Sequence, residues 1–143
     1  MSSDFPFSTA RSSLLNTETF RNLLGNALEN STKSVIVLSA YVKTVGVNWL
    51  KEKISDKKIN CTIVTRWNNG DLAQGSSDLE CYHLAKKNNW SFKVLQDLHA
   101  KVMLVDNDIL FIGSPNLTGR GMSLVPVSNE ELGIKVKALD EDL

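Results

Sequence analysis

The sequence carries no net charge, has little cysteine and has no long apolar run, and each absence excludes a class of protein. Lysine plus arginine and aspartate plus glutamate both total 16, so the chain lacks the basic excess of many nucleic-acid-binding proteins. No run of about 18 apolar residues is present to span a membrane. Residues 1–15 contain no apolar core of a signal peptide. We therefore expect a cytoplasmic protein without a membrane partner, in which any affinity for phosphate is local.

The chain also lacks the usual motifs for metals and nucleotides. Cys61 and Cys81 have no neighbours at metal-ligand spacing, so we expect both to be small buried apolar groups in a reducing compartment. The glycine-rich interval 70–75 lacks the Gly-Lys-Ser/Thr ending of a P-loop, and we interpret it as an ordinary loop. The sequence predicts no bound metal and no cofactor.

Apolar patterning predicts one α/β domain over residues 1–143. A composition of 42% hydrophobic and 22% charged residues is that of a globular chain able to fold without disulfides. Residues 34–42 form an almost continuous apolar and β-branched run, as in a central strand covered on both faces, and residues 61–65 resemble a second buried strand. Helices are expected from Thr17 onward, over 47–54, and over 77–87 with Ser76 or Ser77 as the cap.

From Trp90 onward the pattern changes to short β-rich segments. They cover residues 91–96, 99–105, 109–112 and 131–137, and Asp106-Asn107-Asp108 predicts a tight turn between two antiparallel strands. The fold class predicted is therefore α/β, a mixed β-sheet flanked by helices on both faces. No linker or repeat divides the chain, and we expect flexibility in about the first 15 residues.

The polar residues that can act on a phosphate lie in this second half. His99 and Lys101 are two residues apart on a predicted strand, so their side chains leave the same face of the sheet. Further on, Gly113 opens a turn that carries Ser114 and Asn116, whose hydroxyl and amide can both bond phosphate oxygens. These groups together suit an anionic substrate.

The order and spacing of these residues resemble the HKD motif of the phospholipase D superfamily. The matching elements are His99-Ala100-Lys101, four intervening residues, Asp106, and then Gly113-Ser114-Pro115-Asn116. Residues 65–79 also resemble the phospholipase D-like domains found beside restriction and helicase genes. The resemblance covers residues 34–137 and indicates a single-motif, nuclease-like branch of the superfamily.

The resemblance implies a metal-independent phosphodiesterase with a covalent phosphohistidine intermediate. His99 would be the nucleophile, Lys101 and Asn116 would neutralise the developing charge, and Ser114 would add a hydrogen bond. Glu131, at the third place of the family's Asn-x-Glu pattern, is preferred over Glu130 as the partner that orients His99.

Two motif residues are expected to be structural. Strand alternation places Asp106 on the face opposite His99, so we expect it to hold the turn rather than take part in chemistry. Gly113 is expected to open the turn that carries the phosphate-binding groups.

Two arginines are candidate substrate contacts. Arg120 lies in a predicted turn beyond Asn116, where it can meet a neighbouring phosphate or be an ordinary surface residue. Arg66 lies beside Trp67 and near Asp71, where local packing and a cation–π contact explain the residues as well as substrate binding does.

One imidazole cannot attack phosphorus and protonate the leaving oxygen on its opposite side in the same step. The other histidine, His83, lies on a predicted helix without an H-x-K neighbour, and we interpret it as a surface or half-buried residue. Superfamily members with one motif pair two chains. The sequence therefore predicts a symmetric homodimer that shares His99, Lys101, Ser114 and Asn116.

Three functions are weighed. The leading one is an endonuclease that cleaves DNA, with the alternatives of a phospholipase or phosphatidyltransferase, or of a non-catalytic DNA-binding module. A lipid enzyme needs an apolar entry surface or an amphipathic helix, and the sequence offers no clear one. No dedicated reading helix is visible either, so we expect a nuclease to depend on a separate recognition subunit or domain.

Overall fold

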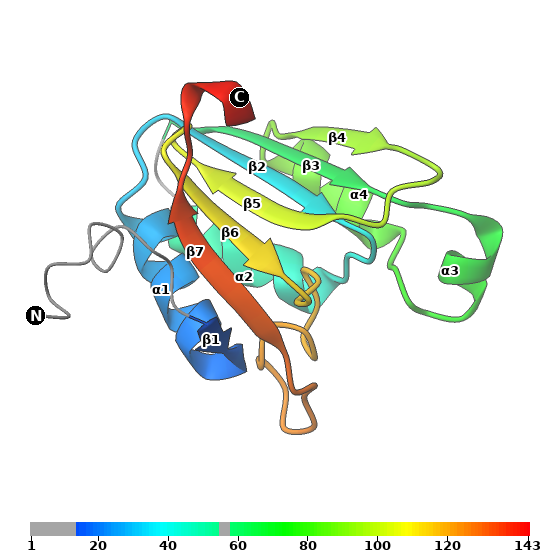
Figure 1. Cartoon of the computed structure of the whole chain (residues 1–143). Helices are drawn as coiled ribbons and strands as arrows, with labels where there is room; N and C mark the ends of the chain where they lie inside the picture. Colours follow the sequence, from blue (N-terminus) through cyan, green and yellow to red (C-terminus); the bar gives the residue numbers. More distant parts are fainter. Residues whose placement is uncertain (1–13, 55–57) are drawn as a thin grey trace, which may run out of the picture.

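A seven-stranded mixed sheet forms the centre of the computed structural model, which describes residues 14–54 and 58–143 (Figure 1). Flexibility was expected in about the first 15 residues, and residues 1–13 of these lie outside the described part of the chain. The strand order is β1-β7-β6-β5-β2-β3-β4. The strands are β1 (Leu14–Asn16), β2 (Ser34–Ser39), β3 (Asn60–Thr65), β4 (Ser91–Val94), β5 (Lys101–Val105), β6 (Ile109–Gly113) and β7 (Leu132–Lys137).

The sheet has a parallel half and an antiparallel half. Strands β2, β3 and β4 run parallel, whereas β5, β6, β7 and β1 join the other side of β2 in antiparallel pairs. The parallel strands are joined by helices α2 (Thr44–Ile54) and α4 (Glu80–Lys87), as parallel connections require. The mixed α/β class predicted from the sequence is therefore confirmed.

Helices α1 (Thr17–Glu29), α2 and α4 lie on the same face of the sheet, behind it in Figure 1. Strand residues on that face are buried, and they pack against apolar positions of the three helices. The rings of Phe20 on α1 and Phe111 on β6, for example, meet edge to face with centroids 5.7 Å apart. This face holds the apolar core.

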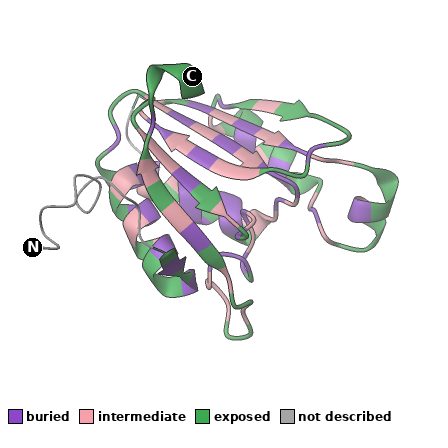
Figure 2. Cartoon of the chain, in the orientation of Figure 1, coloured by how far each residue is buried: buried purple, intermediate pink, exposed green. Residues whose placement is uncertain are grey.

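The opposite face of the sheet is half-buried, which corrects the expectation of helices on both faces. Along β2, buried Val35 and Val37 alternate with half-buried Ile36 and Leu38, and Ile112 on β6 is 37% exposed (Figure 2). A continuous apolar run indicates a strand with two apolar faces. It does not identify what covers the second face, and no described helix does so.

The structure differs from the sequence predictions at several shorter features. A short helix, α3 (Asn69–Ala73), occupies part of the interval interpreted as a loop, and Asn68 caps it by accepting from the Asp71 amide. Helix α4 begins after Leu79 without a side-chain cap, because the Ser77 hydroxyl instead accepts from the backbone amide of Val42. Strand β1 was not predicted, and the C-terminal 3-10 turn η2 (Asp140–Asp142) was not predicted either.

The two cysteines are buried, as the sequence predicts. Cys61 and Cys81 are buried and unpaired, and burial raises the pKa of each thiol to about 12. Thiols with such pKa values remain protonated and unreactive near neutral pH. None of the helices among the described residues has the length and apolar character that a membrane span requires.

Asp106 fixes the turn between β5 and β6 to the start of β2. Asp106 and Asn107 have φ values of 56° and 52°, and the Asp108 amide donates to the Val105 carbonyl at 3.0 Å, which closes a tight antiparallel turn. The Asp106 carboxylate accepts from three consecutive backbone amides at distances of 2.7–3.1 Å, those of Thr32, Lys33 and Ser34. The residue therefore ties two chain segments together.

Replacing Asp106 with asparagine should lower stability in a pH-dependent way. Partial burial raises the pKa of Asp106, but the backbone hydrogen bonds outweigh it, so the net pKa lies below the ordinary value of 3.8. Because the folded pKa is lowered, the carboxylate contributes stability above the unfolded pKa, and this contribution is lost as pH falls through the folded pKa. In urea unfolding, Asp106→Asn should lose about 1–3 kcal/mol at pH 7 and progressively less in acid.

Asp108→Asn is the matched control for that measurement. Asp108 lies in the same turn, but within residues 14–54 and 58–143 the one contact of its carboxylate is an exposed pair with Lys137, 3.8 Å between Oδ1 and Nζ. Such a pair contributes little to stability. Equal losses in the two variants, or a loss at Asp106 that does not depend on pH, would contradict this account.

Candidate active site

The antiparallel half of the sheet gathers the motif residues at one end of three neighbouring strands. Val102 on β5 pairs with Ile112 on β6, and Gly113 at the end of β6 pairs with Gly133 on β7. The start of β5 therefore lies beside the end of β6 and the start of β7. His99 and Lys101 approach this edge along the chain into β5, Ser114 follows β6, and Glu131 precedes β7.

Ser114 and Glu131 are in direct contact across this edge. The Ser114 hydroxyl donates to Glu131 Oε2, and it accepts from the Leu132 amide at 3.0 Å. Glu131 Oε1 accepts from the side-chain amide of Asn129 at 3.1 Å, while the Glu131 backbone amide donates to Thr17 Oγ1 at 2.8 Å. The carboxylate is thus held between a hydroxyl and an amide of its own chain.

Gly113 allows the two strands that carry Ser114 and Glu131 to come together. A Cβ atom on Gly113 would lie 2.5 Å from the Gly133 Cα and 2.5 Å from the Leu132 carbonyl oxygen. Both contacts are with backbone, which cannot move aside as a flexible side chain can. The position therefore requires glycine for close approach of the backbones.

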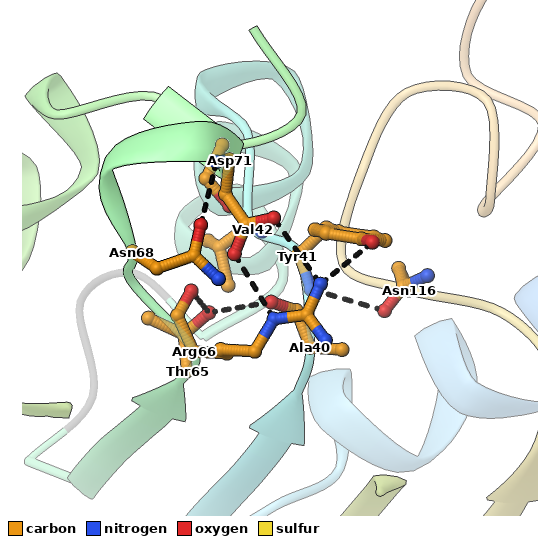
Figure 3. A network of polar contacts seen from close by, with 9 residues as sticks. Ala40, Tyr41, Val42, Thr65, Arg66, Asn68, Asp71 and Asn116 are labelled. Carbon is orange, nitrogen blue, oxygen red and sulfur yellow. Dashed lines mark hydrogen bonds and ion pairs between the residues drawn. The ribbon is translucent and has the colours of Figure 1, made fainter. Parts of the chain in front are cut away.

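The side-chain amide of Asn116 is oriented by the end of β2. Its Oδ1 accepts from the Tyr41 backbone amide at 3.2 Å (Figure 3) and lies 3.3 Å from the Ser39 hydroxyl oxygen. Because the Tyr41 amide can only donate, the Asn116 oxygen must face it, and the Nδ2 group points away from this contact. Among the described residues Nδ2 has no acceptor, so it is available to donate to an anion.

His99 and Lys101 are open to a ligand. His99 is exposed, and within the described chain its imidazole makes no hydrogen bond or ion pair, whereas Lys101 is half-buried and its Nζ donates to the His99 carbonyl at 3.3 Å. The proposed partner of His99, Glu131, is bonded to Ser114 and Asn129 instead, and the exposed Glu130 side chain makes no hydrogen bond to any described residue. Orientation of His99 by Glu131 therefore stays a prediction.

Arg66 is held within an internal network rather than left free for substrate. Its Nε and an NH2 group donate to the two oxygens of Asp71 at 3.0 and 3.1 Å, and the same NH2 group reaches the Tyr41 hydroxyl at 2.7 Å. The guanidinium also lies 4.9 Å from the centroid of the Tyr41 ring (Figure 3). The hydrogen bond to Asp71, together with the charge of that carboxylate, raises the pKa of Arg66 against the effect of burial.

This network extends to the predicted phosphate-binding amide through Tyr41. The side chain of Tyr41 contacts Arg66, and its backbone amide donates to Asn116. Sequence reasoning did not identify Tyr41 or Ser39, because neither belongs to the motif and both lie more than 70 positions from Asn116. Their only signal was position, at the end of the predicted central strand.

The remaining candidates lie elsewhere. His83 is exposed on α4, as expected, with its ring 5.5 Å from that of Tyr82. Arg120 is exposed in the long connection between β6 and β7, where its backbone carbonyl accepts from the Asn129 amide. Across the described part of the chain, no three His, Cys, Asp or Glu side chains cluster as a metal-ligand set would.

An exposed imidazole, a neighbouring lysine, and hydroxyl and amide groups thus lie at one end of the sheet, in the order of the HKD motif. A family model described as "Cardiolipin synthase, PLD-like domain" matches residues 24–141. The chain belongs to this phospholipase D-like family. No curated protein matches the sequence significantly.

Solved structures share this fold at low sequence identity. Nuc from Salmonella typhimurium, a phospholipase D family member, has a TM-score of 0.69 and 16% identity, with 92% of this chain and 86% of that chain covered. NucT from Helicobacter pylori has a TM-score of 0.64 and 19% identity, covering 87% and 84%. Phosphatidylserine synthase from Haemophilus influenzae has a TM-score of 0.68 and 12% identity, but only 34% of its chain is covered.

Replacing Asp71 with asparagine should destabilise the domain more than breaking an exposed ion pair does. The side chains of Arg66 and Asp71 are 20% and 10% exposed, so the variant leaves a guanidinium with little water to compensate for its partner. We expect the free energy of unfolding in urea to fall by more than it does when an exposed ion pair is broken.

The matched control is Glu29→Gln, which removes the exposed pair between Glu29 and Lys53, 2.7 Å apart. That variant should lose less than about 1 kcal/mol. An Asp71→Asn loss no larger than that of the control would show that the Arg66 network contributes little to stability.

Proposed function

We propose that the chain is a metal-independent nuclease that cleaves DNA phosphodiester bonds through a phosphohistidine intermediate on His99. The observation that carries the proposal is the exposed imidazole of His99 beside Lys101, at an edge that also holds Ser114 and the Nδ2 of Asn116; neither the imidazole nor this Nδ2 has a partner among the described residues. A nucleophile, a cation and two neutral donors are the groups that attack on a phosphodiester requires.

The first step forms one bond and breaks one bond. A nitrogen of neutral His99 attacks phosphorus, the P–O bond to the leaving strand breaks, and a protonated second imidazole gives its proton to the leaving oxygen. Lys101 and Asn116 stabilise the charge on the non-bridging oxygens. Water then attacks phosphorus with loss of a proton to the second imidazole, the P–N bond breaks, and both imidazoles return to their starting states.

The second imidazole is proposed to be His99 of another copy. His83 lies on α4, outside the edge that gathers the motif residues, so within one chain it is poorly placed to protonate a leaving oxygen at that edge. A two-fold axis beside His99 would bring two identical half-sites together. The active unit would then be a homodimer with one phosphate site at its interface.

DNA is favoured over lipid because the solved structures that this chain matches over most of both lengths are Nuc and NucT, and not the lipid enzyme. Nuc and NucT match this chain over more than four-fifths of both lengths, whereas the chain covers about a third of phosphatidylserine synthase. The lipid enzyme stays the alternative, and a non-catalytic DNA-binding module is the third reading. A nuclease of this size without a base-reading element would take its sequence specificity from a separate subunit or domain.

Replacing His99 with alanine should abolish cleavage of plasmid DNA in the presence of EDTA, with a loss of at least about a thousandfold. His83→Ala is the matched control, because it removes an exposed imidazole from α4 and should leave the rate unchanged. Gel analysis of plasmid nicking gives the rate, and phosphatidylcholine in mixed micelles is assayed in parallel. His99-dependent cleavage of lipid alone would favour the alternative, and cleavage of neither would favour the binding module.

Mixing active and inactive chains tests the shared site. Wild type and His99→Ala are unfolded and refolded together in equal amounts, so that dimers form at random and about a quarter of them carry two His99 imidazoles. Activity per total protein should fall to about one quarter of wild type, rather than to the one half that dilution alone gives. A value of one half, or an active chain that sediments as a 15.8 kDa monomer, would exclude the two-chain site.

A further inference from the structure

A cavity begins at the motif residue Asn116 and lies beside the other motif residues rather than on them. It has a volume of about 680 Å³ and is bounded by the start of α2, the loop that follows α3, and the connection between β6 and β7. Asn116 and Tyr41 line it, whereas His99 and Lys101 do not. The cavity therefore continues from the predicted phosphate-binding amide in a direction away from the nucleophile.

Two cations without partners line this cavity. Lys43 precedes α2 and Arg120 lies in the connection between β6 and β7, and neither side chain has an ion pair or hydrogen bond within the described residues. Asp78 is the one acidic residue of the lining, and its Oδ2 accepts from the Thr44 amide at 2.8 Å and the Thr44 hydroxyl at 3.2 Å. The positive charge of the cavity is thus left available to a ligand.

The backbone fixes Lys43 relative to Asn116. The Lys43 amide donates to the Leu117 carbonyl at 3.0 Å, and Val42 forms a β-bridge with Leu117. A Cβ on Gly46 would lie 2.4 Å from the Leu117 carbonyl oxygen, so the first turn of α2 packs directly on the segment after Asn116. Lys43 is therefore held beside the predicted phosphate site rather than on a free loop.

We propose that this cavity binds the nucleotide next to the scissile phosphodiester, with Lys43 and Arg120 contacting its flanking phosphate. The identity of the ligand rests on the proposed nuclease function. The volume is within the range of small-ligand sites and is large enough for one nucleotide. A nucleic-acid strand continues from the reacting phosphate to a further anion, which two unpaired cations beyond Asn116 match. The apolar lining is limited to Val45, Val125 and the Tyr41 ring, which does not suit acyl chains.

The test is binding of a short fluorescein-labelled single-stranded DNA, followed by anisotropy over a range of salt concentrations. All proteins carry His99→Ala so that the probe stays intact. Adding Lys43→Gln with Arg120→Gln should raise Kd about tenfold or more at low salt. The same pair should reduce the slope of log K against log salt by about 0.7, since the pair no longer neutralises the one flanking phosphate and each single-strand phosphate contributes about 0.7.

Lys87→Gln with Lys93→Gln is the matched control, because it removes the same charge from exposed positions on α4 and β4 that do not line the cavity. Its Kd and slope should stay within about twofold and 0.3 of the parent. Equal effects in the two pairs, or no binding by the parent, would overturn the inference. Binding to phosphatidylglycerol vesicles that depends on Lys43 and Arg120, with no such dependence for DNA, would overturn it in favour of a lipid ligand.

Failure of this inference is distinguishable from failure of the nuclease proposal. DNA bound through Lys43 and Arg120 but not cleaved by the wild-type chain would remove the nuclease activity and keep the cavity as a nucleotide site. DNA cleaved through His99, with a Kd that does not change when Lys43 and Arg120 are replaced, would support the nuclease activity and exclude the cavity as a nucleotide site.

Discussion

The candidate site depends on one contact, the return of the chain after β6 to the end of β2. The buried Ser39 hydroxyl donates to the Tyr41 carbonyl at 2.7 Å and accepts from the Leu117 amide at 2.9 Å, which fixes the backbone directly after Asn116 to the end of β2. The Asn116 oxygen is then held by the Tyr41 amide (Figure 3). A buried hydroxyl with all its partners supplied gives a short loop a single geometry. Both the orientation of the Asn116 amide and the position of the neighbouring cavity follow from it.

The second constraint is that other backbone segments lie very close to Asn116 and Leu117, which only glycine allows at the facing positions. A Cβ on Gly121 would lie 2.5 Å from the Asn116 carbonyl oxygen, and one on Gly46 would meet the Leu117 carbonyl. Asn116 is therefore packed between a helix start and its own loop. The Arg66–Asp71 pair supports Tyr41 from the far side, so the amide is surrounded by contacts that do not use its Nδ2 group.

Local patterns predicted most of the elements, but not the contacts across the chain. The strands β5 and β6 and the Asp106-Asn107-Asp108 turn depend on neighbours in sequence, and the structure has them close to where they were expected, although β5 begins at Lys101 and His99 precedes it. Ser39 and Tyr41 reach Asn116 across more than 70 positions, so no periodicity signals them. The prediction of a serine cap for α4 was wrong for the same reason, because the Ser77 hydroxyl accepts from the amide of Val42, which lies in a distant segment of the chain. The half-buried face of the sheet shows the same limit. Apolar patterning identifies a strand surface that avoids water, but it does not identify which element packs on that surface.

The bond between Ser114 and Glu131 relates two roles that the motif predicts separately. Ser114 is predicted to bond a phosphate oxygen and Glu131 to orient His99, yet in the structure each satisfies the other. Both roles can hold together only if an arriving phosphate takes the Ser114 hydroxyl, which frees one carboxylate oxygen while Asn129 keeps the other. A carboxylate that loses a neutral donor gains most from a partner that is becoming positive, and the His99 imidazole becomes so as it attacks phosphorus. Substrate binding itself would then complete the orientation of the nucleophile, because the phosphate that His99 attacks is also the group that releases Glu131.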